Sequence, residues 1–204
     1  MKNPAQIAES YVAIGEGKAK LSVTKTLLMA FLAGIFIGIA GIGAMIASCM
    51  IPNPSVSKLV NGCVFPGGLA MVVLAGSELF TGDCLMVITV LEKRIKIYHY
   101  ARTLALVWLG NLIGGLFVSA LAVYGHTMAM FNGEVAKYAI NLAASKCTLS
   151  FTDGLIRGIL CNILVAIAVW MSFAADSAGG KVVSFFLPIL VFVVLGTVNG
   201  ANFT

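Results

Sequence analysis

Long apolar runs constrain this sequence more than any other feature. Five of them follow one another along the chain, at residues 27–51, 64–91, 103–124, 155–173 and 182–195. A helix needs roughly 20 apolar residues to cross the hydrocarbon core of a bilayer. Only 10% of the 204 residues are charged, against about 25% in a typical soluble domain. The sequence therefore predicts an all-α, multi-pass membrane protein with about five spans.

The segment before the first apolar run predicts an amphipathic helix within residues 1–26. Ile7, Tyr11 and Ile14 recur at helical spacing, with the charged residues Glu9, Glu16, Lys18 and Lys20 at other positions of the segment. This pattern is typical of a helix that lies on a membrane surface. A disordered tail is the alternative.

Basic residues are distributed unevenly between the ends of the spans. They gather before the first run and in the loop 92–102, whereas the loop between the first two runs has only Lys58. Because basic loops stay in the cytoplasm, we expect the amino terminus, the loop 92–102 and residues 174–181 on the cytoplasmic side of the cell's inner membrane. Residues 52–62 and 126–153 then face outside. This asymmetry explains the net charge of +5 without a nucleic-acid partner.

The stretch AGSELFTGD, residues 75–83, interrupts the second apolar run. Unpaired backbone groups and charges are costly in lipid, so a broken span is tolerated where it borders a wet cavity. We expect Ser77 to cap a following half-helix, and Glu78 to turn away from the cavity and accept hydrogen bonds from backbone N–H groups. The alternative for Glu78 is a protonated carboxyl at the cavity wall. The side chains of Leu79, Phe80 and Thr81 would then project into a path for a solute.

Glycines inside the spans predict close helix packing. Gly34 and Gly38 form one small-xxx-small pair, and Gly110 and Gly114 form another. Such pairs let helix backbones touch in a membrane, so a compact bundle is expected.

A second irregular element is expected at residues 143–154, before the fourth span. Lys146 would concentrate anions at the floor of a funnel, and the amide of Asn162 would lie near its ammonium if this element folds back toward the membrane centre. The alternatives are a solvated loop charge for Lys146 and an interhelical hydrogen bond for Asn162.

Motifs for catalysis and for metal or nucleotide binding are missing from the sequence. The five cysteines form no CxxC motif, and neither His99 nor His126 stands in a triad pattern. No Gly-rich phosphate loop is present. We therefore expect no cofactor, no metal and no enzymatic activity.

The sequence resembles the formate/nitrite transporter family of pentameric anion channels. The resemblance rests on GSELFTG at 76–82, WLGNLIGG at 108–115, GILCNILVAIAVWMSFAA at 158–175 and FFLPILVFVVLG at 185–196. It implies an aquaporin-like bundle of six spans, with the second and fifth broken and a pore inside each protomer of a homopentamer. It implies formate, nitrite or hydrosulfide as the permeating anion.

The resemblance also implies roles for individual residues. Phe65, Leu69 and Phe192 correspond to a pore constriction; Leu79, Phe80 and Thr81 to a central loop gate, with Glu78 in support; and Lys146 and Asn162 to the pair beside the central chamber.

The carboxyl-terminal part departs from the family pattern. Asn199 stands in GTVNGANFT where the family carries a histidine, and the sixth span is missing after Thr204. We therefore expect residues 27–204 to form a truncated channel domain, with proton coupling unsupported. A non-conducting membrane scaffold or assembly subunit is the alternative function. A channel for neutral solutes is disfavoured by Lys146.

Overall fold

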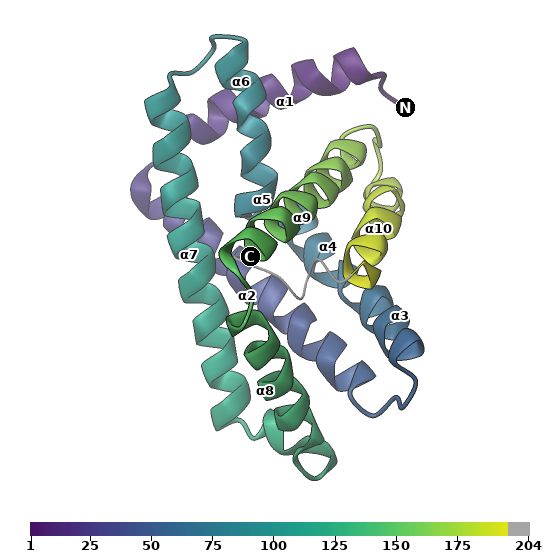
Figure 1. The fold of residues 1–204 in the computed structure, drawn as a ribbon. Helices are drawn as coiled ribbons and strands as arrows, with labels where there is room; N and C mark the ends of the chain where they lie inside the picture. Colours follow the sequence, from purple (N-terminus) through teal and green to yellow (C-terminus); the bar gives the residue numbers. More distant parts are fainter. Residues whose placement is uncertain (196–204) are drawn as a thin grey trace.

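The computed structural model describes residues 1–195, and all regular structure within that range is helical (Figure 1). The helices are α1 Pro4–Ala19, α2 Val23–Ser48, α3 Pro54–Val64, α4 Pro66–Ala75, α5 Phe80–Asp83, α6 Val87–Leu91, α7 Ile97–Tyr124, α8 Glu134–Cys147, α9 Phe151–Ser172 and α10 Ala178–Val194, with 3-10 turns η1 Cys84–Met86 and η2 Thr127–Gly133. Asn199 lies outside the described residues.

Four helical stretches are long and apolar enough to cross a membrane within the described range: Val23–Ser48, Pro54–Ala75, Ile97–Tyr124 and Phe151–Ser172. Two shorter apolar stretches, Phe80–Leu91 and Ala178–Val194, accompany them. The predicted all-α membrane fold is confirmed, and so is the broken second span, because helix is lost between Ala75 and Phe80.

The predicted boundaries were wrong in two places. Residues 52–62 were expected to be a loop, yet α3 begins at Pro54, where the Asn53 side chain accepts from the backbone N–H groups of Ser55 and Val56. The segment 143–154 was expected to be irregular, yet α8 continues to Cys147 and α9 begins at Phe151. Helices α3 and α8 mix polar and apolar residues, so a search for continuous apolar runs overlooks them.

The contact between α2 and α7 depends on glycine. A Cβ atom at Gly34 would lie 2.2 Å from the backbone oxygen of Asn111, and one at Gly114 would lie 2.1 Å from that of Phe31. Cβ atoms at Gly38 and Gly110 would meet side chains of the opposite helix at 2.3 and 2.5 Å. The predicted small-xxx-small packing is confirmed, because only glycine allows the two backbones to approach this closely.

Helix α1 packs against the protein at the end where α6 turns into α7 (Figure 1). Its start is fixed by a capping box between Asn3 and Gln6. Its buried residues recur at every fourth position: Ile7, Tyr11, Gly15 and Ala19. Ile7 and Tyr11 of the expected apolar stripe therefore face the protein, whereas Ile14 is only partly buried. Helix α2 begins at Val23, before the expected boundary at residue 26.

Candidate functional site

The break in the second span is built by Gly76 and Ser77. Gly76 adopts a left-handed conformation with φ of 72° and ends α4, a conformation that glycine reaches without steric cost. The backbone N–H of Ser77 donates to the oxygen of Val72 at 3.0 Å, and the hydroxyl donates to the same oxygen at 3.3 Å. The expected role of Ser77 is therefore wrong: it closes the preceding half-helix and does not cap the next one.

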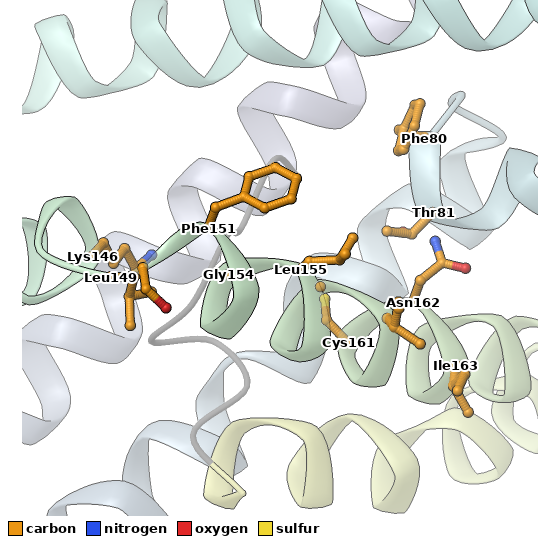
Figure 2. Close-up of a pocket in the computed structure, with 13 residues that line it drawn as sticks. Phe80, Thr81, Lys146, Leu149, Phe151, Gly154, Leu155, Cys161, Asn162 and Ile163 are labelled. Carbon is orange, nitrogen blue, oxygen red and sulfur yellow. The ribbon is translucent and has the colours of Figure 1, made fainter.

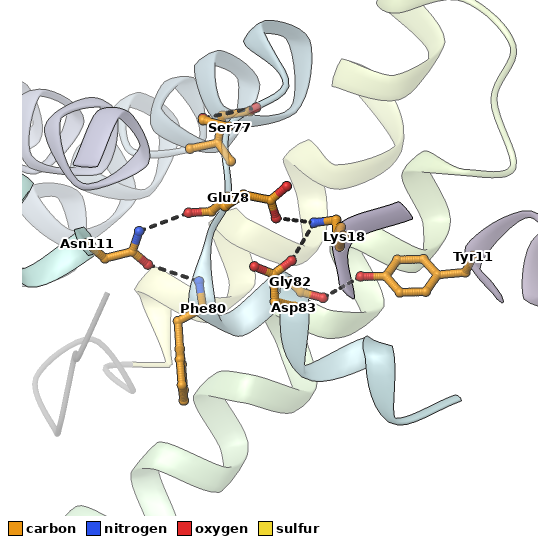
Figure 3. A network of polar contacts seen from close by, with 9 residues as sticks. Tyr11, Lys18, Ser77, Glu78, Phe80, Gly82, Asp83 and Asn111 are labelled. Carbon is orange, nitrogen blue, oxygen red and sulfur yellow. Dashed lines mark hydrogen bonds and ion pairs between the residues drawn. The ribbon is translucent and has the colours of Figure 1, made fainter. Parts of the chain in front are cut away.

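Asn111 of α7 supports the broken backbone (Figure 3). Its amide nitrogen donates to the carbonyl oxygens of Ala30 and Glu78 at 2.8 and 2.9 Å, and its oxygen accepts from the N–H of Phe80 at 2.9 Å. One buried side chain thus replaces the helical partners that the break removes. The sequence analysis missed this residue, although a lone amide inside an apolar span is a recognisable signal.

A buried ionic cluster joins α1 to the segment after the break. The Lys18 ammonium lies 2.5 Å from the Glu78 carboxylate and also contacts the Asp83 carboxylate (Figure 3). Burial opposes the charge on Lys18, but the carboxylates of Asp83 and Glu78 outweigh it and raise the pKa of the ammonium. Glu78 was expected to bind backbone N–H groups; its carboxylate binds Lys18 instead.

Tyr11 provides a second link between α1 and this segment. Its hydroxyl donates to the carbonyl oxygen of Gly82 at 2.6 Å, and its ring meets that of Phe173 edge-on at 5.2 Å. Burial raises the pKa of the phenol, so the hydroxyl stays a donor. Neither Tyr11 nor Lys18 was predicted as part of the site, because their partners lie 60 or more positions away in the sequence.

Three hollows lie along the broken span. The first, the Lys146 chamber, has a volume of about 780 Å³ and is lined mainly by α9, together with Phe80, Thr81 and Lys146 (Figure 2). The second, the apolar neck, has a volume of only about 20 Å³. The third, the Lys18 chamber, has a volume of about 180 Å³ and contains Lys18, Glu78 and Asp83.

The apolar neck gathers residues from five helices, α2, α4, α5, α9 and α10, and from the break. Its lining consists of Ile37, Phe65, Leu69, Leu79, Thr81, Val165, Ile189 and Phe192. The rings of Phe65 and Phe192 lie 6.1 Å apart. A volume of this size holds about one water molecule, so the neck is closed to a larger solute in this conformation.

Shared lining residues connect the three hollows in series. Thr81 lines both the Lys146 chamber and the neck. Leu69 and Leu79 line both the neck and the Lys18 chamber. The structure thus brings together five of the residues singled out in the sequence, Phe65, Leu69, Leu79, Thr81 and Phe192, at the neck, whereas Phe80 lies in the Lys146 chamber.

Thr81 and Asn162 offer polar groups inside the first hollow. The Thr81 hydroxyl is buried and has no hydrogen-bond partner among the described residues. The Asn162 amide donates to the Cys84 sulfur at 3.4 Å. Figure 2 shows that Asn162 lies beside Thr81, whereas Lys146 lies at the opposite end of the chamber. The expected proximity of the Asn162 amide to the Lys146 ammonium is therefore wrong, because α8 does not fold back as far as Asn162.

Lys146 stands in the last turn of α8, half-buried, with no acidic partner in residues 1–195. Burial lowers the pKa of its ammonium. An uncompensated cation at the wall of a mostly apolar hollow attracts anions, because the low dielectric strengthens the interaction.

Comparison with known proteins gives consistent matches over nearly the whole chain. The profile of a family described as formate/nitrite transporter matches residues 5–199. An uncharacterized transporter, YrhG, of Bacillus subtilis (strain 168) is 37% identical over 199 residues, covering 96% of this chain and 74% of that protein.

Two solved structures share the fold. One is a pentameric formate channel with formate bound, 31% identical, with a TM-score of 0.77 over 85% of this chain and 69% of that one. The other is an FNT family ion channel, 28% identical, with a TM-score of 0.85 over 94% of this chain and 77% of that one.

Proposed function

The chain belongs to the formate/nitrite transporter family, and we propose that it conducts small monovalent anions of weak acids through a pore inside each protomer. The observation that carries this proposal is the series of three hollows, joined by Thr81 at one side of the neck and by Leu69 and Leu79 at the other.

Lys146 draws an anion into the first chamber. The chamber is lined mostly by apolar side chains, and the ammonium has no carboxylate to neutralise it in the described part of the chain. Two unit charges 4 Å apart attract by about 4 kcal/mol at an effective dielectric of 20. This attraction offsets part of the cost of dehydrating the anion.

Thr81 and Asn162 replace part of the lost hydration deeper in the chamber. The buried Thr81 hydroxyl is free to donate to an anion, since it has no other described partner. Channels of this kind select solutes by the donors that line the path and by its width. The apolar neck then rejects hydrated cations, because it has no room for a hydration shell and is lined almost entirely by apolar side chains. Its side chains must move for any solute larger than water.

Formate is the first candidate substrate, because a solved relative is a pentameric formate channel with formate bound. The same likeness supports a homopentamer. Nitrite and hydrosulfide remain candidates, since they are also small monovalent anions. The uneven distribution of basic residues supports a cytoplasmic amino terminus in the cell's inner membrane.

Reconstitution tests this function. The purified full-length chain in liposomes is expected to raise formate uptake at least tenfold over protein-free liposomes, whereas glycerol uptake stays at the protein-free level. Nitrite and hydrosulfide uptake in the same vesicles assigns the finer specificity. Absence of flux for all three anions would favour the rival function, a non-conducting membrane scaffold.

A further inference from the structure

We propose that a basic pocket at the end of α1, separate from the three hollows, binds the headgroup of an anionic phospholipid. The pocket has a volume of about 560 Å³ and is lined by Glu16, Lys20, Lys93, Arg94, Lys96 and His99, together with Ala19 and Ile95. It shares no lining residue with the Lys146 chamber, the neck or the Lys18 chamber.

The pocket carries an excess of positive charge. Glu16 is its one acidic lining residue, and it is already paired with Arg94 at 2.6 Å. Lys20, Lys93 and Lys96 have no acidic partner within residues 1–195. Three ammonium groups therefore face one hollow without compensation, and a phosphodiester is the anion that membranes supply at this position.

A closed turn between α6 and α7 fixes the backbone at Lys93 and Arg94. The N–H of Lys93 donates to the oxygen of Val90 at 2.9 Å, and the N–H of Arg94 donates to that of Thr89 at 3.0 Å. Lys93 itself has a left-handed φ of 56°. Because the backbone is held on both sides, the basic side chains of this turn are presented together, and less conformational entropy is lost when a ligand binds.

Exposed apolar side chains surround the same turn and favour a lipid over a soluble anion. Leu91, Ile97 and Tyr98 are 74%, 64% and 68% exposed, and α7 begins at Ile97. Tyrosine is enriched where a membrane meets water, and a basic cluster directly beside a span binds anionic headgroups. A site for free phosphate would need no apolar rim.

Native mass spectrometry of the full-length chain in detergent, titrated with phosphatidylglycerol or phosphatidylcholine, tests the proposal. The chain is expected to bind phosphatidylglycerol at least tenfold more tightly than phosphatidylcholine. Each lysine near a headgroup contributes about fivefold in affinity, so Lys93→Gln with Lys96→Gln weakens phosphatidylglycerol binding by about twentyfold and leaves phosphatidylcholine binding unchanged.

A matched double variant removes the same charge elsewhere. Lys58→Gln with Lys137→Gln alters two exposed lysines outside the pocket, and its phosphatidylglycerol affinity is expected to stay within twofold of the unaltered chain. Equal losses in the two double variants, or no preference for phosphatidylglycerol in the unaltered chain, would overturn the proposal. Displacement of the lipid by millimolar glycerol 1-phosphate would also overturn it, since the pocket would then bind free phosphate esters. Binding is measured without transport, so this result is independent of whether the chain conducts anions.

Discussion

Lys18 and Lys146 line the two chambers beside the broken span, Lys18 together with Lys181, and the surroundings of Lys18 and Lys146 are opposite. Lys18 reaches from α1 to Glu78 and Asp83, and its side chain is 20% exposed. Lys146 stands at the end of α8 without an acidic partner in the described range. The neighbouring carboxylates raise the pKa of the Lys18 ammonium, whereas burial lowers the pKa of the Lys146 ammonium.

In the proposed mechanism, this difference separates Lys18, a structural cation, from Lys146, the cation that acts on the anion. The two carboxylates beside Lys18 more than offset its positive charge, so this residue does not attract an anion and mainly holds α1 to the protein. The positive charge of Lys146 is not offset by a carboxylate and can attract an anion, although burial disfavours the charged form of this side chain. Compensation by neighbouring acids, more than residue type, therefore indicates which lysine acts on an anion.

The largest expected effect is on α1 and comes from Lys18→Met. The change leaves Glu78 and Asp83 buried without their cation, and breaking a buried ion pair costs about 3 kcal/mol. Hydrogen exchange of the α1 amides is expected to show roughly a hundredfold increase in the undocked population. Lys20→Met, which removes an exposed lysine two positions away, should change exchange by less than threefold. Equal effects of the two variants would mean that the ionic cluster does not hold α1.

The next effect is on the apolar neck. Leu69 is 3% exposed and lines the neck, so Leu69→Ala enlarges the narrowest point of the proposed route. Truncation of a buried leucine costs about 2–5 kcal/mol, and we expect lower thermal stability together with severalfold higher uptake of both formate and glycerol. Val135→Ala, at a buried site away from the hollows, is the control, and it should change stability without changing glycerol uptake. Unchanged glycerol uptake in Leu69→Ala would place the route elsewhere.

Alkaline pH distinguishes the two lysines without any substitution. The pKa of Lys146 lies below the ordinary value of 10.5, so formate uptake should fall as pH rises toward that value. The pKa of Lys18 lies above it, so its contribution to docking is complete below the unfolded value and is lost only at still higher pH. Uptake should therefore decline while the α1 amides remain protected. Lys146→Arg should keep uptake flat over the same range, because arginine stays charged; a parallel decline in this variant would assign the titration to another group.

The smallest expected effect comes from Tyr11→Phe. This variant keeps the ring contact with Phe173 and removes the hydroxyl that donates to the Gly82 oxygen at 2.6 Å. Loss of one such hydrogen bond costs about 1 kcal/mol. Exchange of the α1 amides should increase about fivefold, well below the effect of Lys18→Met. An effect as large as that of Lys18→Met would shift the main anchoring role from the ionic cluster to Tyr11.

The sequence predicted the features that local pattern controls. The glycine at position 76 and the charges after it marked the break, and the spacing of Gly34, Gly38, Gly110 and Gly114 predicted the α2–α7 contact. Both depend on constraints that act within a few residues, namely backbone conformation and helix periodicity.

Long-range partners could not be predicted in the same way. The contacts of Lys18 with Asp83 and of Asn111 with Ala30 join residues 65 and 81 positions apart, and no local pattern specifies them. Ser77 was misassigned because its hydroxyl can serve either the helix before it or the helix after it. In the structure it donates to the Val72 oxygen, and the Phe80 N–H donates to the distant Asn111 side chain.

The central claim is that Lys146 acts on the permeating anion, and formate uptake by Lys146→Ala in liposomes tests it most directly. Lys137→Ala, an exposed site on the same helix, is the matched control. We predict about tenfold lower uptake for Lys146→Ala, equivalent to about 1.4 kcal/mol, with unchanged thermal stability and with Lys137→Ala at the level of the unaltered chain. Equal uptake in all three proteins would contradict the claim.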